Sequence, residues 1–181
     1  MTDQGRTTNA TAERRTPNAA PLLAVEHLTT VFDTAEGPVP AVDDVSFEIR
    51  AGETLGLVGE SGSGKSVTAL SIMRLVQPPG RIASGRLWFK GRDLMTLGER
   101  EMQSVRGAEI SLIFQEPMTA LNPVFRVGAQ IAETLLVHGR ATRGEARDKS
   151  IELLRAVRIP NPESRIRDYP HQLSGGMRQR V

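Results

Sequence analysis

GESGSGKS, residues 59–66, is the stretch that decides the fold of this 181-residue chain. It satisfies the pattern G-x-x-x-x-G-K-[S/T]. The apolar run TLGLVG leads into it, and apolar residues at helical spacing follow it. Glycines at 59, 62 and 64 permit the backbone conformations and the close approach that a phosphate cradle needs. The sequence therefore predicts a phosphate-binding loop that joins a buried strand to a helix.

The positions of this loop have separate expected roles in binding a nucleotide. Backbone N–H groups at 61–67 would wrap the β-phosphate, assisted by the positive end of the following helix. Lys65 would reach the β- and γ-phosphates, and the Ser66 hydroxyl would coordinate Mg²⁺. A glycine-rich turn with an incidental lysine is the alternative, and kinases, GTPases, helicases and transport ATPases all share such loops. The residues predicted to contact the nucleotide are Gly59, Glu60, Ser61, Gly62, Ser63, Gly64, Lys65, Ser66 and Val67.

The segments around the loop predict an α/β domain with a strand-rich first half and a helical second half. The run at 54–59 is typical of a strand buried on both faces, whereas alternation favours antiparallel strands nearer the start. Strands are expected at residues 22–32, 41–49, 54–59, 85–91 and 107–115. Helices are expected at residues 67–76, 99–106, 127–137 and 145–157.

The composition excludes several classes of protein. The net charge is only +2, from 23 Lys and Arg against 21 Asp and Glu, so it favours no nucleic-acid partner. The chain lacks cysteine, which rules out disulfides and thiolate metal sites, and its three histidines are scattered. No apolar run approaches the roughly 20 residues that span a bilayer. Residues 1–21 carry almost no large apolar side chain, so we expect a flexible tail there.

Two polar features lie downstream of the loop. Gln115 ends the predicted strand at 107–115, where open α/β sheets bind ligands, and could orient Mg²⁺ or an attacking water. In LSGGM, residues 173–177, Ser174 is suited to cap a helix, and Gly175 and Gly176 expose backbone N–H groups at its start. Taken singly, a glutamine at a strand end is more often an ordinary loop residue, and the second segment taken alone is better explained as an ordinary capped helix.

The order of these features resembles the ATP-binding cassette (ABC) family: a phosphate loop, a strand-end glutamine, and an LSGG signature after a helical insert. The resemblance covers residues 22–181. Within the family, GESGSGKS, IFQEPMTALNP and YPHQLSGGMRQRV are most similar to ATPase subunits of oligopeptide, dipeptide, glutathione and nickel importers. It implies an α/β fold: a P-loop NTPase core with an antiparallel β edge subdomain and an inserted α-helical subdomain, incomplete at the C-terminus. Residues 22–115 would form the nucleotide-binding part, 116–173 the helical subdomain and 174–181 the start of the signature helix.

The resemblance also implies roles for individual residues. Phe32 would stack on adenine, although packing in the strand core explains this phenylalanine equally well. Gln115 would contact Mg²⁺ and water. Ser174, Gly175 and Gly176 would bind the γ-phosphate of ATP held by a second ATPase subunit, in a head-to-tail homodimer or heterodimer. Met177 replaces the commoner glutamine of the family and leaves both glycine donors intact.

As a member of this family, the protein would couple ATP binding and hydrolysis to uptake of peptides or a related small solute. The solute would pass through separate transmembrane permease subunits, on which the helical subdomain docks. The ATPase would lie at the cytoplasmic face of the membrane and meet a solute-binding protein only indirectly. The transported solute would never touch this chain.

The next elements of the family pattern do not follow the signature in this sequence. They are a strand that ends in Asp-Glu, which supports Mg²⁺ and the attacking water, and a later switch histidine. The resemblance therefore implies that the sequence is part of a longer enzyme. Without that strand, TLGLVG would keep unpaired backbone groups, so we expect the 181 residues alone to bind nucleotide weakly, hydrolyse it negligibly and aggregate.

Two other functions remain as alternatives. A soluble cassette ATPase that acts on DNA or ribosomes would need no permease, but such proteins usually carry coiled-coil or zinc inserts or tandem cassettes. The insert between Gln115 and Ser174 is short and free of cysteine, which favours transport. A small-molecule kinase or GTPase would use only the phosphate loop and would leave the LSGG segment unexplained.

Overall fold

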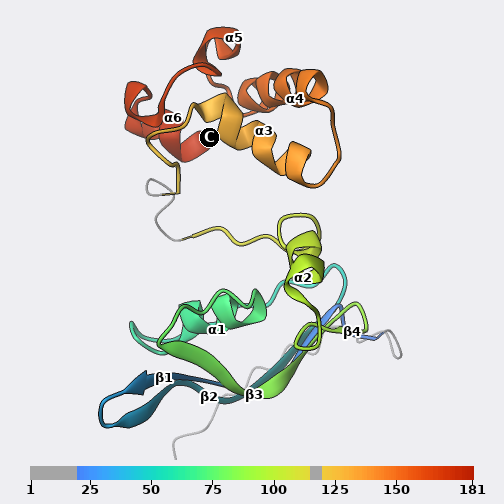
Figure 1. The fold of residues 1–181 in the computed structure, drawn as a ribbon, viewed down its shortest axis with the longest axis vertical. Coiled ribbons are helices and arrows are strands. Elements are labelled where there is room, and N and C mark those ends of the chain that lie inside the picture. Colours follow the sequence, from blue (N-terminus) through green and yellow to red (C-terminus); the bar gives the residue numbers. More distant parts are fainter. Residues whose placement is uncertain (1–19, 115–119) are drawn as a thin grey trace, which may run out of the picture. The chain divides into compact units, whose positions relative to one another are not determined.

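An antiparallel sheet and a group of helices form two separate units of the chain, Met1–Leu97 and Gly98–Val181 (Figure 1). The computed structural model describes residues 20–114 and 120–181. Each unit is described by itself below. Among the described residues, no helix is both long and apolar enough to cross a membrane. The predicted tail at 1–21 lies almost wholly outside the described part of the chain.

The sheet of the first unit has four strands in the order β2-β1-β3-β4. β1 (Leu23–Thr34) and β2 (Gly37–Ile49) form a hairpin, and β3 (Gly80–Phe89) pairs antiparallel with the other edge of β1. The short β4 (Arg92–Asp93) pairs with the end of β3. Strands predicted at 22–32, 41–49 and 85–91 are therefore confirmed, with β2 and β3 longer than the sequence suggested.

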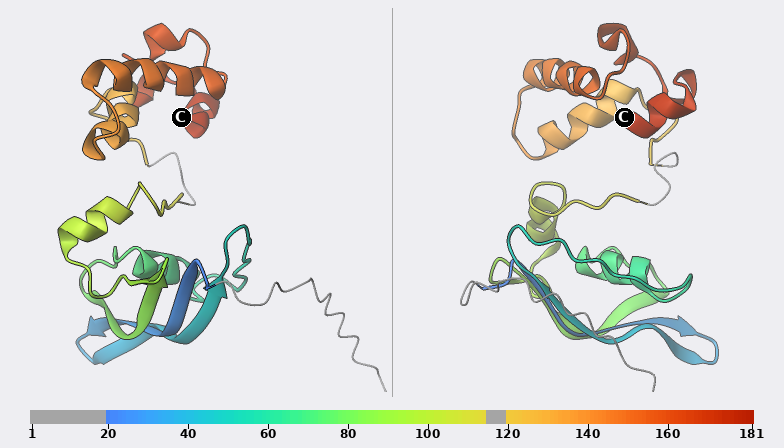
Figure 2. Two further views of the ribbon diagram at one scale, coloured as in Figure 1. Left: turned by 90° about the vertical axis from the view of Figure 1, so that its right-hand side faces the viewer. Right: turned by 180° about the vertical axis from the view of Figure 1, so that it is seen from behind.

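Helix α1 (Lys65–Ile72) covers one face of this sheet (Figures 1 and 2). The Thr30 hydroxyl of β1 and the Ser71 hydroxyl of α1 form a buried hydrogen bond of 2.8 Å between the two layers. Since buried polar groups need partners, this bond provides one for each of the two hydroxyls. The core includes Ala24, Val25, Leu28, Val31, Val42, Met73, Leu87, Phe89 and Leu94.

Two predicted strands are wrong. Residues 54–59 have no regular secondary structure, and residues 107–114 contain only an isolated bridge between Arg106 and Ile110. Val58 is 94% exposed and Ile113 is 89% exposed. A strand that buries both faces needs a hydrogen-bonded neighbour on each side, and neither segment has one among the described residues. TLGLVG therefore lacks a strand partner among the described residues, as the sequence led us to expect.

The second unit is helical, as the sequence predicted. α2 (Glu99–Val105), α3 (Val127–Val137) and α4 (Arg143–Ala156) confirm the expected helices. The short α5 (Pro162–Arg165) and the 3-10 turn η2 (Pro170–Gln172) were not predicted, and α6 (Gly175–Arg180) follows Ser174 as expected. One core cluster of the unit consists of Val127, Leu154, Ile159, Ile166 and Leu173, with Ile131, Ile151, Met177 and Val181 packed against it.

Candidate phosphate-binding site

The loop at 59–64 turns tightly and leads directly into α1. The Ser63 backbone N–H donates to the Glu60 carbonyl oxygen at 3.2 Å, which closes the turn. Gly62 and Gly64 both have a φ of 84°, in the left-handed region that favours glycine. The helix then begins at Lys65, two residues before the start that apolar spacing predicted.

Gly64 also lies against the neighbouring strand β2. A Cβ atom at Gly64 would collide with the carbonyl oxygen of Ala41, and it would lie 3.4 Å from Val42 Cγ2. Gly62 has the same φ, but a Cβ there would meet no atom within 4 Å. The glycine at 64 is therefore required both by backbone conformation and by packing on the sheet.

The Lys65 ammonium group is held inside the loop. Its Nζ donates to the carbonyl oxygens of Gly59 and Glu60, each at 2.7 Å, and to the Ser63 hydroxyl at 3.0 Å. A lysine ammonium has three donors, so all three are used by oxygens of this one loop. These contacts fix a positive charge at the N-terminus of α1, where the first turn carries no acidic residue. The result is a small region of positive potential that suits an anion.

Ser66 and Val67 follow in the first turn of α1. The side chain of Ser66 is exposed, and Val67 is half-buried. Hydroxyl oxygens are hard ligands of the kind that Mg²⁺ accepts, so an exposed serine beside a phosphate-binding turn fits a role in holding this ion. The structure brings all nine predicted loop residues together in the first unit.

Phe32 lies on β1 in the same unit, opposite Val39 of β2 and Gly80 of β3. A Cβ atom at Gly80 would come within 2.8 Å of Phe32 Cε1 and 2.7 Å of Val76 Cγ1. The half-buried ring therefore packs over the bare backbone of Gly80. Stacking of Phe32 on adenine stays a prediction.

The signature residues lie in the second unit. The Ser174 hydroxyl accepts a hydrogen bond from the Met177 backbone N–H at 3.3 Å and so caps α6. Gly175 and Gly176 are exposed, neither has a positive φ, and a Cβ at either would meet no atom within 4 Å. Nothing in the described fold requires glycine at these two positions. Gln115 lies outside the described residues, so its expected contact with Mg²⁺ stays a prediction.

One set of residues was missed by sequence reasoning. Four arginines from three segments of the chain line a single groove of the helical unit. Only the i, i+4 spacing of Arg143 and Arg147 on one helix was a usable signal. The sequence gives no indication that the other two, Arg126 and Arg167, lie beside them.

A phosphate loop that follows an antiparallel sheet and leads into a helix, in a chain whose second unit is helical, defines a nucleotide-binding cassette. Residues 42–181 match the family model described as ABC transporter. This chain therefore belongs to the ABC transporter family.

Curated relatives are similar over most of the chain. A probable peptide ABC transporter ATP-binding protein of Sinorhizobium fredii is 53% identical over 166 residues, which are 91% of this chain and 50% of the relative. An oligopeptide transport ATP-binding protein of Bacillus subtilis is 52% identical over 161 residues, with 88% of this chain and 45% of the relative covered. A dipeptide transport ATP-binding protein of Haemophilus influenzae is 50% identical, with 88% and 48% covered. The chain thus spans about half the length of these relatives.

Solved structures support the fold. A bacterial ABC transporter cassette solved as a dimer has a TM-score of 0.73 and 24% sequence identity, covering 87% of this chain and 66% of its own. A post-hydrolysis dimer bound to ADP and Pi gives the same values. At this identity the likeness establishes the fold class, which is the predicted α/β cassette with an antiparallel sheet.

Proposed function

We propose that this chain is the ATP-binding part of an ABC importer that couples ATP hydrolysis to uptake of peptides or a related small solute. The observation that carries the proposal is the phosphate loop, in which Lys65 is ordered at the start of α1 by three loop oxygens. The names of the relatives, which are peptide, oligopeptide and dipeptide transport proteins, support the choice of solute.

At this loop, Lys65 would exchange its loop acceptors for oxygens of the β- and γ-phosphates. The exchange replaces neutral carbonyl oxygens with charged ones, and charge-assisted hydrogen bonds are roughly twice as strong as neutral ones. The backbone N–H groups of the loop and of the first turn of α1 would bind the β-phosphate. Ser66 and Gln115 would hold Mg²⁺, which neutralises phosphate charge when it is bound.

The signature would act on a second subunit. Ser174, Gly175 and Gly176 would bind the γ-phosphate of ATP held by another ATPase subunit, in a head-to-tail homodimer or heterodimer. The open space around both glycines supports this role. Packing within the chain does not require glycine at either position, whereas the absence of a side chain lets an external group approach the backbone closely.

The permease would dock on an apolar surface along α3, formed by Phe125, Ala129, Leu136 and Val137. These residues line a groove of about 370 Å³, and Val137 is 70% exposed. Exposed apolar surface of this kind marks protein contacts. Docking there would place the chain at the cytoplasmic face of the membrane, with the solute-binding protein only an indirect partner.

The intact protein tests the nucleotide site. Lys65→Ala should lower the rate of Mg²⁺-dependent ATP hydrolysis by about 100-fold or more, since it removes the cation that meets the developing phosphate charge. Ser174→Arg should abolish hydrolysis while the binding of a fluorescent ATP analogue persists. Lys149→Ala, which removes an exposed lysine of α4, is the control and should hydrolyse ATP normally. Full hydrolysis by Lys65→Ala would refute the assignment.

Membranes that contain the cognate permease test the docking surface. Val137→Glu should weaken co-sedimentation of the intact protein with these membranes by roughly tenfold, because it places a charge in an apolar contact. Val39→Glu alters another exposed valine, on β2, and should sediment normally. Absence of any association, with or without ATP, would instead favour a soluble cassette ATPase.

A further inference from the structure

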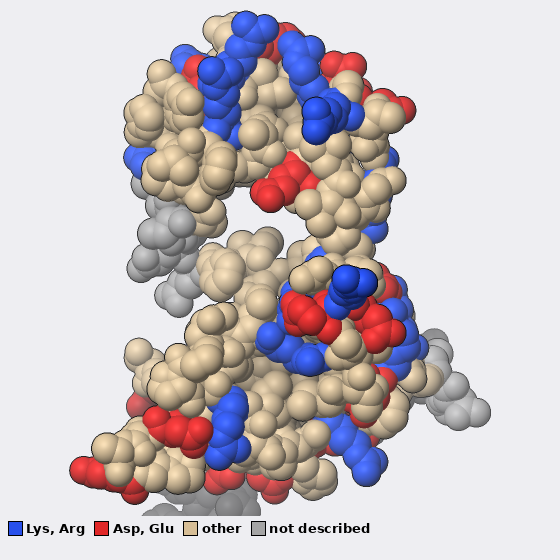
Figure 3. Space-filling view, viewed as in Figure 1, with Lys and Arg blue, Asp and Glu red and all other residues tan. Residues whose placement is uncertain are grey.

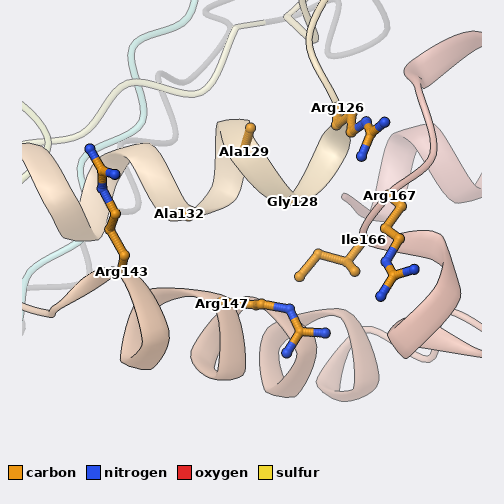
Figure 4. A pocket seen from close by; sticks show the side chains of 8 residues that line it. All are labelled: Arg126, Gly128, Ala129, Ala132, Arg143, Arg147, Ile166 and Arg167. Atoms are coloured by element: carbon orange, nitrogen blue, oxygen red, sulfur yellow. The ribbon is translucent and has the colours of Figure 1, made fainter.

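Four arginines surround a groove between α3 and α4 in the helical unit. Arg126 precedes α3, Arg143 and Arg147 project from α4, and Arg167 follows α5 (Figure 4). The groove has a volume of about 330 Å³, and its floor is apolar: Gly128, Ala129, Ala132 and Ile166. No acidic residue lines it. Basic side chains also gather visibly on the helical unit in the space-filling view (Figure 3).

Backbone contacts hold one end of the groove in place. The Val127 N–H donates to the Asp168 carbonyl oxygen at 2.9 Å, and the Gly128 N–H donates to the Ile166 carbonyl oxygen at 3.0 Å. A Cβ at Gly128 would collide with Ile166, so glycine allows this close approach. Arg167 lies between the two bonded carbonyls and is thereby fixed beside the start of α3. The arginines are thus brought together by the fold.

The guanidinium groups are largely without carboxylate partners. Arg147 Nη1 lies 3.7 Å from Oδ1 of the exposed Asp148, and Arg126 Cζ lies 5.9 Å from the centroid of the Tyr169 ring. No ion pair in the described part of the chain involves Arg126, Arg143 or Arg167. Three of the four positive charges of the groove therefore have no ion-pair partner among the described residues.

Several of these positions are unfavourable for the helices themselves. Arg126 is the N-cap of α3 and Arg143 is the first residue of α4, although helix N-termini favour anions. Arg143 and Arg147 are like charges at i, i+4, which destabilise a helix. Stability of the isolated unit therefore does not explain the cluster, whereas binding of an external anion does.

We propose that this groove binds an acidic peptide segment of a partner protein, in which carboxylates flank an apolar side chain. The carboxylates would pair with the arginines, whose planar forks match carboxylate geometry, and the apolar side chain would lie on the Ala132 and Ile166 floor. Arg143 lies at one end of the groove and Arg126 and Arg167 at the other, so one phosphate could not engage them all (Figure 4). A concave site also suits a protruding segment better than a flat lipid surface.

The test uses the intact protein and a short fluorescein-labelled peptide in which glutamates flank a central leucine. Fluorescence anisotropy should show binding of this peptide and none of its glutamine counterpart. The double variant Arg143→Gln, Arg147→Gln should weaken binding by roughly tenfold or more, since charged hydrogen bonds are lost. Arg167→Gln should weaken it from the opposite end of the groove.

The matched control removes the same number of charges from the same helix but away from the groove. Lys149→Gln with Arg155→Gln should leave affinity within about twofold, because distant exposed charges contribute little at physiological salt. Equal losses in both double variants, or equal binding of the glutamine peptide, would overturn the proposal. Full displacement of the peptide by millimolar inorganic phosphate, or by phosphatidylglycerol vesicles, would also overturn the proposal. It would indicate that the groove binds phosphate or a lipid headgroup instead.

This proposal is independent of the nucleotide site, because the phosphate loop belongs to the other unit. Binding of a fluorescent ATP analogue should be the same in the groove variants and the native protein. Loss of peptide binding with ATP binding intact therefore reports on the groove alone. Loss of both peptide binding and ATP binding in the double variant would indicate misfolding, which circular dichroism would detect. Peptide binding by the single variant Arg167→Gln would then test the groove.

Discussion

At the scale of single residues, alanine substitutions at Gly62 and Gly64 distinguish the energetic cost of backbone strain from that of a steric clash. Both have a φ of 84°, but only a Cβ at Gly64 would strike the Ala41 carbonyl oxygen. Gly62→Ala should lower the free energy of unfolding by about 1 kcal/mol, because alanine is unfavourable in the left-handed region and no steric clash is added. Gly64→Ala should cost about 1–3 kcal/mol more, because β2 or the loop must move. Urea unfolding of the two variants measures the difference, and equal costs would contradict the contact with Ala41.

At the scale of elements, α4 begins at a capping box. The Thr142 hydroxyl accepts from the Glu145 N–H, and the Glu145 carboxylate accepts from the Thr142 N–H at 2.7 Å and hydroxyl at 2.7 Å. Thr142→Ala removes the cap and should lower the free energy of unfolding by about 1 kcal/mol. Thermal unfolding checks this loss. Thr96→Ala, an exposed threonine outside any helix, should unfold close to the native temperature.

The same element predicts a dependence on pH. Hydrogen bonds from the Thr142 side chain and backbone lower the pKa of Glu145 below its ordinary value of 4.5. The stabilisation is therefore complete above 4.5 and is lost as the pH falls through the lowered pKa. NMR titration of the carboxyl carbons should show the pKa of Glu145 rise in Thr142→Ala. The pKa of Glu152, lowered by Lys149 instead, should stay unchanged.

At the scale of the whole molecule, exposed apolar segments should cause self-association. Leu57 and Val58 in the first unit and Ile113 and Phe114 in the second are exposed and lack strand partners among the described residues. Light scattering of the 181-residue chain should show a mass that rises with concentration. Val58→Thr with Ile113→Thr should reduce it, whereas Val39→Thr, at an isolated exposed valine, should not. A monomer at all concentrations would contradict this expectation.

Local pattern was sufficient for much of the molecule. The loop pattern at 59–66 predicted a turn that leads into a helix, alternation predicted β1 and β2, and helical spacing predicted α3 at its observed bounds. These features depend on residues that lie within a few positions of one another, so they can be predicted from the sequence alone. The strands predicted at 54–59 and 107–115 failed because a buried strand also needs distant partners to pair with.

The sequence by itself thus determined the family, the pattern of the phosphate loop and the helices α2, α3, α4 and α6, since each is encoded by residue types at short, regular spacing. Tertiary structure alone decided why residue 64 must be glycine beside Ala41, and that four arginines from three segments share one groove. These contacts join residues far apart in the chain. Their geometry depends on how strands and helices pack, and no local pattern specifies it.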